Sequence, residues 1–253
     1  MRKIALITGA TSGIGKETAK RLAKDGFDLI VTGRRKERLG ELKDEIIKDN
    51  LHTDVLTLSF DIRIYSEVEA NLKGLSGKWK NVDVLINNAG LAVGLNPIHE
   101  GVREDWERMI DTNIKGLLYV TRLISPQMVE RKSGHIINIA SIAGKEVYPN
   151  GNVYCATKHA VDAISKGTRM DLINYGIKVT QICPGFAETE FSLVRFKGDK
   201  DRADKVYDGF VPLLAEDIAD AIAYAVNAPD HVDIQDMLIM PKAQASATIF
   251  HKE

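Results

Sequence analysis

The segment most suited to chemistry is the glycine-rich stretch ITGATSGIGKETA at 7–19. A P-loop for ATP requires GxxxxGK followed by Ser or Thr, but Ala10 stands at the first glycine position and Glu17 at the hydroxyl position, which disfavours ATP. The glycines still suit a tight turn and a close approach to a pyrophosphate, although a generic turn between strand and helix is the alternative. Their spacing, Gly9-x3-Gly13-x-Gly15, also differs from the common GxGxxG pattern.

Tyr154 and Lys158 form a second candidate pair. Four residues apart on a helix they share one face, with Cβ atoms about 5–6 Å apart. A free phenol has a pKa of about 10, and a neighbouring ammonium stabilises the phenolate and lowers that value. Tyr154 is therefore a candidate acid/base. The same spacing is common on amphipathic surface helices, so simple packing is the alternative.

Ser141 directly follows the apolar run HIINIA at 135–140. If that run is a strand, Ser141 lies at its carboxyl end, where ligands bind in open α/β sheets. Its hydroxyl could then hold and polarise a substrate oxygen. A serine that merely begins a turn is the alternative.

The elements that would position these residues follow from the hydrophobic pattern. Short runs, most of them apolar throughout, are typical of strands buried on both faces, and they alternate with amphipathic helical patterns. This alternation predicts an α/β fold, a doubly wound parallel sheet with helices on both faces, in which the glycine loop begins the first helix at a site suited to an anion. The predicted strands are 3–8, 28–32, 54–59, 82–87, 135–140, 177–183 and 236–240, and the predicted helices are 13–25, 35–49, 64–77, 104–131, 153–175 and 215–228.

Several motifs in register resemble the short-chain dehydrogenase/reductase family. They are TGATSGIG at 8–15, NNAG at 87–90, Ser141 and Tyr154-x3-Lys158, followed by PG at 184–185. The resemblance covers nearly the whole chain. It implies one Rossmann-like domain over 1–253 with about seven parallel strands, a nicotinamide cofactor, an alcohol dehydrogenase or carbonyl reductase activity, and a homotetramer.

The resemblance also implies roles for individual residues. Asn113, in DTNIKG at 111–116, resembles the family's fourth catalytic residue, which kinks a helix and anchors a water beside the lysine. Asp61 matches an adenine contact and Thr189 a carboxamide contact. The implied catalytic set is Asn113, Ser141, Tyr154 and Lys158, and the implied cofactor-binding set is Gly9, Thr11, Ser12, Gly13, Ile14, Gly15, Arg34, Arg35, Asp61, Ile62, Asn88, Ala89, Gly90, Tyr154, Lys158, Pro184, Gly185 and Thr189.

The choice of cofactor depends on the end of the second strand, VTGRRKER at 31–38. An NAD enzyme would place an acid there to accept a hydrogen bond from the ribose 2′-hydroxyl. Here Arg34 and Arg35 stand instead, and arginine binds a 2′-phosphate with charge-assisted hydrogen bonds. We therefore predict NADP(H). A solvated basic turn is the alternative, although cations there oppose the helix dipole.

The substrate is predicted from a closer resemblance within the family, to its NADP-dependent 3-hydroxy acid dehydrogenases. That branch acts on serine, allo-threonine, 3-hydroxyisobutyrate and 3-hydroxypropionate, and reduces malonic semialdehyde. Ketoacyl, polyol or steroid reductases of the same family, and a non-catalytic dinucleotide sensor, are the alternatives. The stretches that carry the resemblance are TGRRKERL at 32–39, NNAGLAVG at 87–94, EDWERMIDTN at 104–113, GNVYCATK at 151–158 and TEFSLVRFKGD at 189–199.

A substrate loop is expected around 185–212, with Thr189 near the nicotinamide. A closed site must neutralise the carboxylate of a small hydroxy acid, and Arg195 is the predicted clamp, with Lys197 as second choice. Ser141 is expected to bind the substrate oxygen. The charged segment 196–205 reads as a solvated surface or part of a lid, and the pocket wall is expected to include Lys145, Glu146 and Tyr148.

Composition sets further expectations. With 34 Lys+Arg against 35 Asp+Glu the net charge is −1, so neither nucleic acid nor an anionic membrane is favoured as a partner. No apolar run reaches transmembrane length, and cytoplasm is the expected compartment. Cys155 and Cys183 are expected to be reduced thiols, and the six histidines have no metal-ligand spacing, so no metal is predicted.

Overall fold

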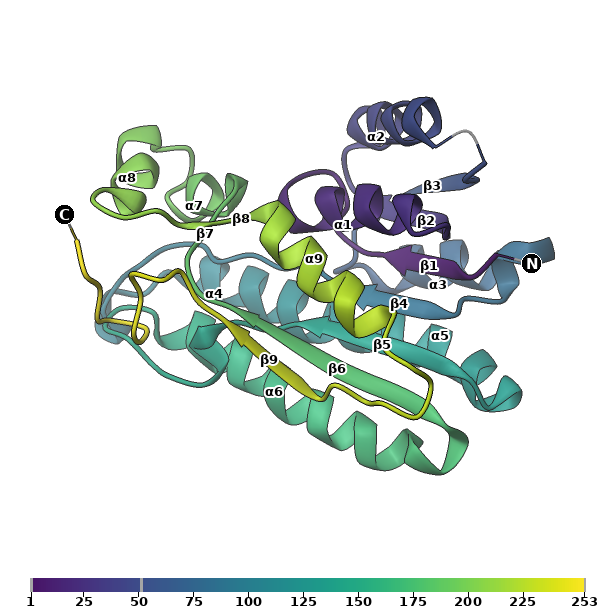
Figure 1. Ribbon diagram of the computed structural model, residues 1–253. Helices are drawn as coiled ribbons and strands as arrows, with labels where there is room; N and C mark the ends of the chain where they lie inside the picture. The colour runs from purple at the N-terminus through teal and green to yellow at the C-terminus, as the bar shows by residue number, and fades with distance from the viewer. Residues whose placement is uncertain (1, 51, 253) are drawn as a thin grey trace.

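The computed structural model describes residues 2–50 and 52–252 and contains a seven-stranded parallel sheet (Figure 1). Its strands are β1 Ile4–Ile7, β2 Asp28–Gly33, β3 Val55–Ser59, β4 Val84–Asn87, β5 Gly134–Ile139, β6 Ile177–Pro184 and β9 Asp236–Ile239. They lie side by side in the order β3-β2-β1-β4-β5-β6-β9. All seven predicted strands are confirmed, with small shifts at their ends, and so is the predicted fold class.

Helices cover both faces of the sheet, which explains why the strands are apolar on both sides. α1, α2 and α9 pack on one face through buried residues such as Leu22, Leu39 and Ile222. α3 and α5 pack on the other face through Val68 and Ile124. The helices are α1 Gly13–Lys24, α2 Lys36–Asp49, α3 Tyr65–Lys73, α4 Arg103–Ile110, α5 Leu117–Arg131, α6 Asn152–Leu172 and α9 Ala215–Val226, and the short 3-10 turns among them are η1 Gly77–Lys80, η2 Ile98–Glu100, η4 Ile142–Gly144 and η5 Ile173–Tyr175.

The strand order creates a switch point at β1, which pairs with β2 on one side and β4 on the other. The chain runs outward from β1 to β3 and then returns to continue outward from β4, so the loops after β1 and β4 diverge. This divergence opens a crevice at the carboxyl ends of the strands, where open α/β sheets bind ligands.

The prediction of one continuous helix over 104–131 is wrong, because the structure interrupts that helix near its middle. A π-helical turn, η3 Asp111–Gly116, separates α4 from α5. A π turn inserts one residue into the helical repeat and is commonly found at functional sites. The interruption coincides with DTNIKG, the segment in which the family resemblance implies a helix kink at Asn113.

The segment 185–212, which we call the lid, has more regular structure than predicted. A two-residue parallel pair, β7 Ala187–Glu188 with β8 Leu213–Leu214, closes its base. The short helices α7 Glu190–Arg195 and α8 Lys200–Asp204 and the turn η6 Lys205–Tyr207 lie between these strands. In Figure 1, α7 and α8 are at the upper left, above the C-terminal segment. The charged residues 196–205 therefore include all of α8.

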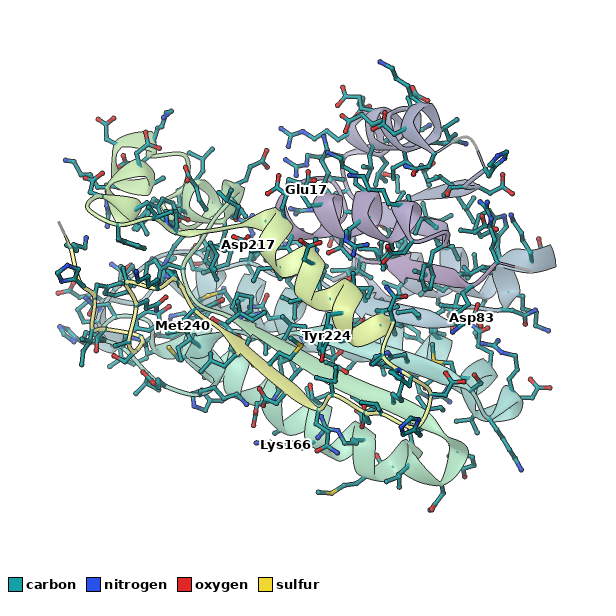
Figure 2. The ribbon with its side chains drawn as sticks, in the orientation of Figure 1. Glu17, Asp83, Lys166, Asp217, Tyr224 and Met240 are labelled. Carbon is teal, nitrogen blue, oxygen red and sulfur yellow. The ribbon has the colours of Figure 1, made fainter. Side chains whose placement is uncertain are left out.

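Polar side chains accept hydrogen bonds from backbone amides at the starts of α9 and β1. Asp217 accepts a hydrogen bond from the Leu214 amide at 2.8 Å where α9 begins, and Asp83 accepts one from the Ile4 amide at 2.8 Å where β1 begins (Figure 2). Both cysteines are buried free thiols, as expected. Within 2–50 and 52–252, no helix combines the length and apolarity needed to cross a membrane.

Candidate active site

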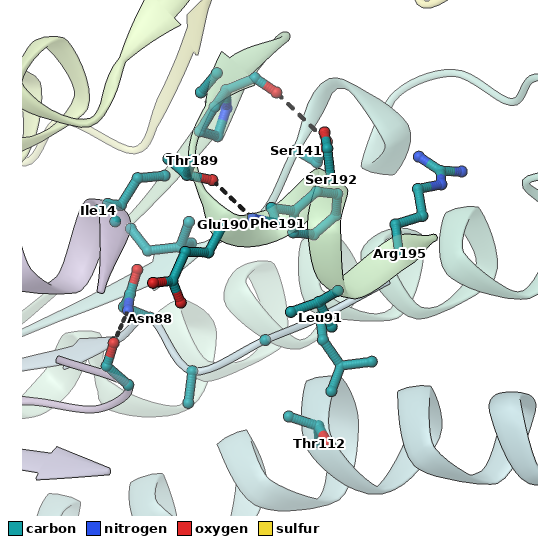
Figure 3. Close-up of a pocket in the computed structure, with 18 of the residues that line it drawn as sticks. Ile14, Asn88, Leu91, Thr112, Ser141, Thr189, Glu190, Phe191, Ser192 and Arg195 are labelled. Carbon is teal, nitrogen blue, oxygen red and sulfur yellow. Dashed lines mark hydrogen bonds between the residues drawn. The ribbon is translucent and has the colours of Figure 1, made fainter. Parts of the chain in front are cut away.

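A cavity of about 510 Å³ lies at the carboxyl ends of the strands, of a size that holds a small ligand or cofactor. The glycine loop, the ends of β2 to β6, α6 and the lid all contribute to it (Figure 3). It brings together every predicted site residue except Gly15 and Asn113. The predicted residues that line it are Gly9, Thr11, Ser12, Gly13, Ile14, Arg34, Arg35, Asp61, Ile62, Asn88, Ala89, Gly90, Ser141, Tyr154, Lys158, Pro184, Gly185, Thr189 and Arg195.

The glycine loop has a shape that side chains would prevent. Gly9 has φ +68°, in the left-handed region that favours glycine. A Cβ on Gly15 would lie 2.4 Å from Asn88 Nδ2 and 2.5 Å from the Gly9 oxygen. The Asn88 amide donates to the carbonyls of Thr8 and Gly9 at 2.9 and 3.1 Å, tying the end of β4 to the loop. The start of α1 is thus open to a phosphate group.

The two predicted 2′-phosphate ligands both lie at the end of β2. Arg35 donates to Thr11 Oγ1 at 2.8 Å and to Ser12 Oγ at 2.9 Å, so its guanidinium lies across the glycine loop. Arg34 lines the same end of the cavity. Asp61, the predicted adenine contact, also lines it, and Arg63 pairs with the Asp61 carboxylate at 2.6 Å. This pairing lowers the pKa of Asp61.

The predicted acid/base pair lies on the cavity side of α6. The Lys158 Nζ atom is 6.0 Å from the centre of the Tyr154 ring and donates to the Ile139 carbonyl at 2.8 Å. Ser141 follows β5 and begins η4; its Oγ accepts from the Ala143 amide at 3.1 Å. Its hydroxyl also donates to the Pro184 carbonyl at 3.4 Å. All three residues line the cavity.

In the chain without a cofactor, the pKa of Tyr154 is raised and not lowered as expected. Burial raises the pKa of Tyr154, while hydrogen bonding from Ser141 and the Arg195 cation oppose that rise without outweighing it. Burial also lowers the pKa of Lys158 to about 8. The physical reason is that both groups are desolvated, and the ammonium is directed at the Ile139 carbonyl. The chain thus keeps Tyr154 protonated at neutral pH.

Asn113 lies behind the cavity. Its amide donates to the Leu91 carbonyl at 2.8 Å and to Thr157 Oγ1 at 3.0 Å, and its Oδ1 accepts from the Leu91 amide at 2.9 Å. The π turn thereby fixes the loop after β4 against α6. A Cβ on Gly90 would lie 3.3 Å from Asn113 Oδ1 and 3.6 Å from Lys158 Nζ, so Asn113 is close to the lysine. Its role in anchoring water stays a prediction.

The lid brings a cation to the phenol. Arg195 donates to the Tyr148 hydroxyl at 2.8 Å, and its Cζ atom lies 5.3 Å from the Tyr148 ring centre and 5.7 Å from that of Tyr154. Its Nε atom is buried without a hydrogen-bond partner among the described residues. Lys197, the second choice, does not line the cavity, because it pairs with Asp105 at 2.8 Å.

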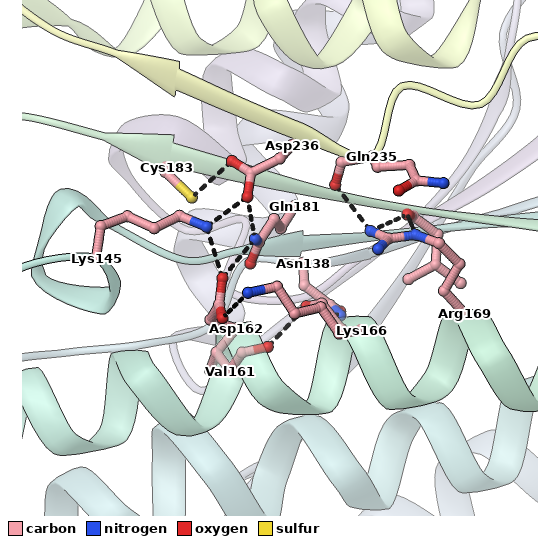
Figure 4. A network of polar contacts seen from close by, with 12 residues as sticks. Asn138, Lys145, Val161, Asp162, Lys166, Arg169, Gln181, Cys183, Gln235 and Asp236 are labelled. Carbon is pink, nitrogen blue, oxygen red and sulfur yellow. Dashed lines mark hydrogen bonds and ion pairs between the residues drawn. The ribbon is translucent and has the colours of Figure 1, made fainter.

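Two of the three residues that were expected to line the cavity wall lie outside it. Tyr148 lines the cavity, but Lys145 and Glu146 do not. Lys145 pairs with Asp162 of α6 and Asp236 of β9 (Figure 4), and Glu146 accepts from the Ala247 amide at 2.8 Å. The Lys145 ammonium and the Glu146 carboxylate thus have their partners outside the cavity, which explains why neither residue lines it.

The sequence reasoning missed contributions from the lid helix α7. Glu190, Phe191 and Val194 line the cavity, and Phe191 packs edge-on against the Tyr154 ring with centres 5.6 Å apart. Thr189 caps α7 by accepting from the Phe191 amide at 3.2 Å. A capping threonine followed by apolar residues three apart was the available signal for this helix.

Comparison with known proteins agrees with this architecture. Residues 3–199 match the family described as short chain dehydrogenase, and the chain belongs to that family. It is 48% identical over 245 residues to the NADP-dependent 3-hydroxy acid dehydrogenase YdfG of Escherichia coli (strain K12), covering 96% of this chain and 97% of the relative. It is 43% identical to sulfoacetaldehyde reductase 2 of Chromohalobacter salexigens, covering 97% and 96%.

A solved structure is also similar. The closed form of a serine dehydrogenase complexed with NADP+ superposes with a TM-score of 0.93 at 46% identity, covering 99% of this chain and 100% of that chain. The family and the arrangement of Ser141, Tyr154 and Lys158 make the chain an oxidoreductase of the alcohol dehydrogenase or carbonyl reductase kind.

Proposed function

We propose that the chain is an NADP-dependent dehydrogenase that interconverts a small 3-hydroxy acid and its 3-oxo acid or semialdehyde. The candidate substrates are serine, allo-threonine, 3-hydroxyisobutyrate and 3-hydroxypropionate. The main support for this proposal is the position of Arg195. Its Cζ atom lies 5.7 Å from the ring centre of Tyr154, the proposed proton-transferring residue. In a 3-hydroxy acid one carbon separates the reacting carbinol from the carboxylate, so an anion clamp must lie this close to the acid/base.

The cavity fits NADP(H). Glycine at positions 9 and 15 lets the loop pack closely against Asn88, and the start of α1 beside it can bind a pyrophosphate. Arg34 and Arg35 would hold the 2′-phosphate, with Thr11 and Ser12 beside them. When bound, this cofactor supplies the hydride acceptor or donor.

The chain's own residues handle the oxygen and its proton. Ser141 holds the substrate oxygen, and Tyr154, kept protonated by burial, donates a proton to a carbonyl oxygen during reduction. Lys158, one helical turn away, stabilises the phenolate that remains. In the oxidative direction the same groups accept the proton, which requires added positive charge to offset the burial of the phenolate.

The alternatives lack a matching observation. A ketoacyl, polyol or steroid reductase has no need of a half-buried cation beside the phenol, and a dinucleotide sensor has no need of Ser141, Tyr154 and Lys158 together. The name of one relative adds a sulfonate aldehyde, which the same arginine could bind. The homotetramer, the cytoplasmic location and the single domain with its substrate loop at 185–212 stay predictions.

A steady-state panel tests the function. The acids L-serine, L-allo-threonine, 3-hydroxyisobutyrate and 3-hydroxypropionate are compared with uncharged 1-propanol, each with NADP+ and NAD+, and malonic semialdehyde and sulfoacetaldehyde are tested with NADPH. We expect at least one acid to be oxidised far faster than 1-propanol, with NADP+ strongly preferred. In Arg34→Asp the NADP+ preference should fall. Equal use of the two cofactors by the wild type, or equal turnover of 1-propanol, would refute the proposal.

A further inference from the structure

Glu190, the first residue of α7, reaches from the lid to the two arginines at the start of α2. Its carboxylate accepts from Arg35 Nη1 at 2.9 Å and from Arg38 Nη1 at 2.6 Å. Its side chain lines the cavity, and Figure 3 shows the carboxylate directed into it. An ion pair therefore joins the lid to the 2′-phosphate end of the cavity.

The contact lies where a phosphate would bind. The remaining Arg35 donors point to Thr11 and Ser12, and Arg34 lines the same end. Carboxylate and phosphate are both bound by the guanidinium fork, and one fork face cannot hold both fully. A bound phosphate of −1.5 to about −2 charge would also repel a carboxylate at this distance.

Glu190 is ionised under ordinary conditions. Burial raises the pKa of its carboxyl group, but hydrogen bonds and charges from Arg35 and Arg38 outweigh burial and leave the pKa below its usual value. The ion pair is also accessible to exchange, because the Glu190 and Arg35 side chains are 41% and 42% exposed. Such exposed pairs are weak and give way to a stronger ligand.

We propose that Glu190 is a built-in competitor for the cofactor's 2′-phosphate, which displaces it from Arg35 and so links cofactor binding to the position of the lid. This inference rests on the proposed use of NADP(H). The link is short, since Glu190 and Arg195 are the first and last residues of α7 and lie about 7.5 Å apart along its axis. Glu190 and the proposed substrate clamp, Arg195, thus belong to the same helix.

Binding calorimetry on the whole chain tests the competition without turnover. The probes are adenosine 2′,5′-bisphosphate and adenosine 5′-monophosphate, which differ only in the 2′-phosphate. Glu190→Gln should bind the bisphosphate about three- to tenfold more tightly than wild type, the effect expected from losing exposed ion pairs, and the monophosphate equally well. Glu188→Gln, on the same lid but outside the cavity lining, is the matched control and should leave both affinities unchanged.

The increase in bisphosphate affinity caused by Glu190→Gln should be smaller in an Arg35→Gln background. The guanidinium for which the carboxylate and the phosphate compete is then absent. Weaker bisphosphate binding by Glu190→Gln would overturn the proposal, since Glu190 would then orient the arginines for phosphate. An equal change for both probes would overturn it as well and indicate a general effect of the lid. A wild type that binds the two probes equally would instead refute the use of NADP and remove the basis of this inference.

Discussion

At the scale of the residue, the site places a neutral phenol and a cation against each other in a buried corner. Burial raises the pKa of Tyr154 and lowers that of Lys158 to about 8. Each shift favours the uncharged form, as desolvation requires. In the chain without a cofactor, Tyr154 is therefore a neutral phenol at pH 7.

Arg195 gives a residue-scale prediction. In Arg195→Met, the KM for 3-hydroxypropionate should rise about 10- to 100-fold, since charge-assisted hydrogen bonds to the carboxylate are lost. The KM for 1-propanol should change little, because that substrate has no anion. Steady-state kinetics measure both.

Lys197→Met is the matched control, because Lys197 is a lid cation that pairs with Asp105 outside the cavity. Its KM values should stay within about twofold of wild type. If Lys197→Met had the larger effect on the acid, the carboxylate clamp would have been assigned to the wrong residue.

At the scale of the element, a polar network ties the site to the edge of the sheet (Figure 4). Lys145, just after the Ser141 turn, pairs with Asp162 of α6 at 2.6 Å and with Asp236 of β9. Gln181 of β6 donates to the same two carboxylates. The pKa of Asp162 is lowered, because hydrogen bonds from Lys145, Lys166 and Gln181 outweigh its burial. The network thereby fixes Ser141 relative to the helix that carries Tyr154.

Removing the centre of this network should cost stability. Lys145→Met leaves two carboxylates facing each other without their shared cation, and the free energy of unfolding should fall by about 2 kcal/mol. Lys166→Met is the control, because Lys166 also pairs with Asp162 but is 53% exposed. It should cost about 0.5 kcal/mol or less in urea unfolding. Equal losses in the two variants would contradict the assigned importance of Lys145.

The sequence predicted secondary-structure elements well where a pattern within a few neighbouring residues determines the local structure. The strands were found because a short apolar run suits a strand covered on both faces, and the glycine loop because only glycine fits at Gly9 and Gly15. The hydrophobic pattern did not show the π turn, which only the family resemblance placed as a kink at Asn113; Asn113 bonds to Leu91, 22 residues away. The pairing of Arg195 with Tyr148 spans 47 residues and could only be guessed from charge.

At the scale of the whole molecule, a buried histidine makes stability sensitive to acid. His135 in β5 is 4% exposed, and its Nε2 atom lies 2.8 Å from Thr180 Oγ1 on β6. Burial, with help from Lys178 and Lys3, lowers its pKa to about 3. The unfolded chain binds a proton there near pH 6.5, so stability is fully present above about pH 6.5 and is lost as the pH falls toward 3.

His135→Leu should flatten that dependence. At neutral pH it should cost about 1 kcal/mol, since the Thr180 hydroxyl loses its partner. Between pH 7.5 and 5 its free energy of unfolding should fall less than that of wild type, as measured by urea unfolding. The exposed His231→Leu is the control and should keep the wild-type slope. An unchanged slope in His135→Leu would assign the acid sensitivity to other groups.

The most direct measurement of the central claim is the turnover of Tyr154→Phe with NADPH and malonic semialdehyde. Loss of the proposed proton donor should lower kcat about 100- to 10,000-fold, the usual contribution of a positioned general acid. Binding of adenosine 2′,5′-bisphosphate, at the far end of the cavity, should be unchanged and show that the variant is folded. Turnover equal to wild type would contradict the account.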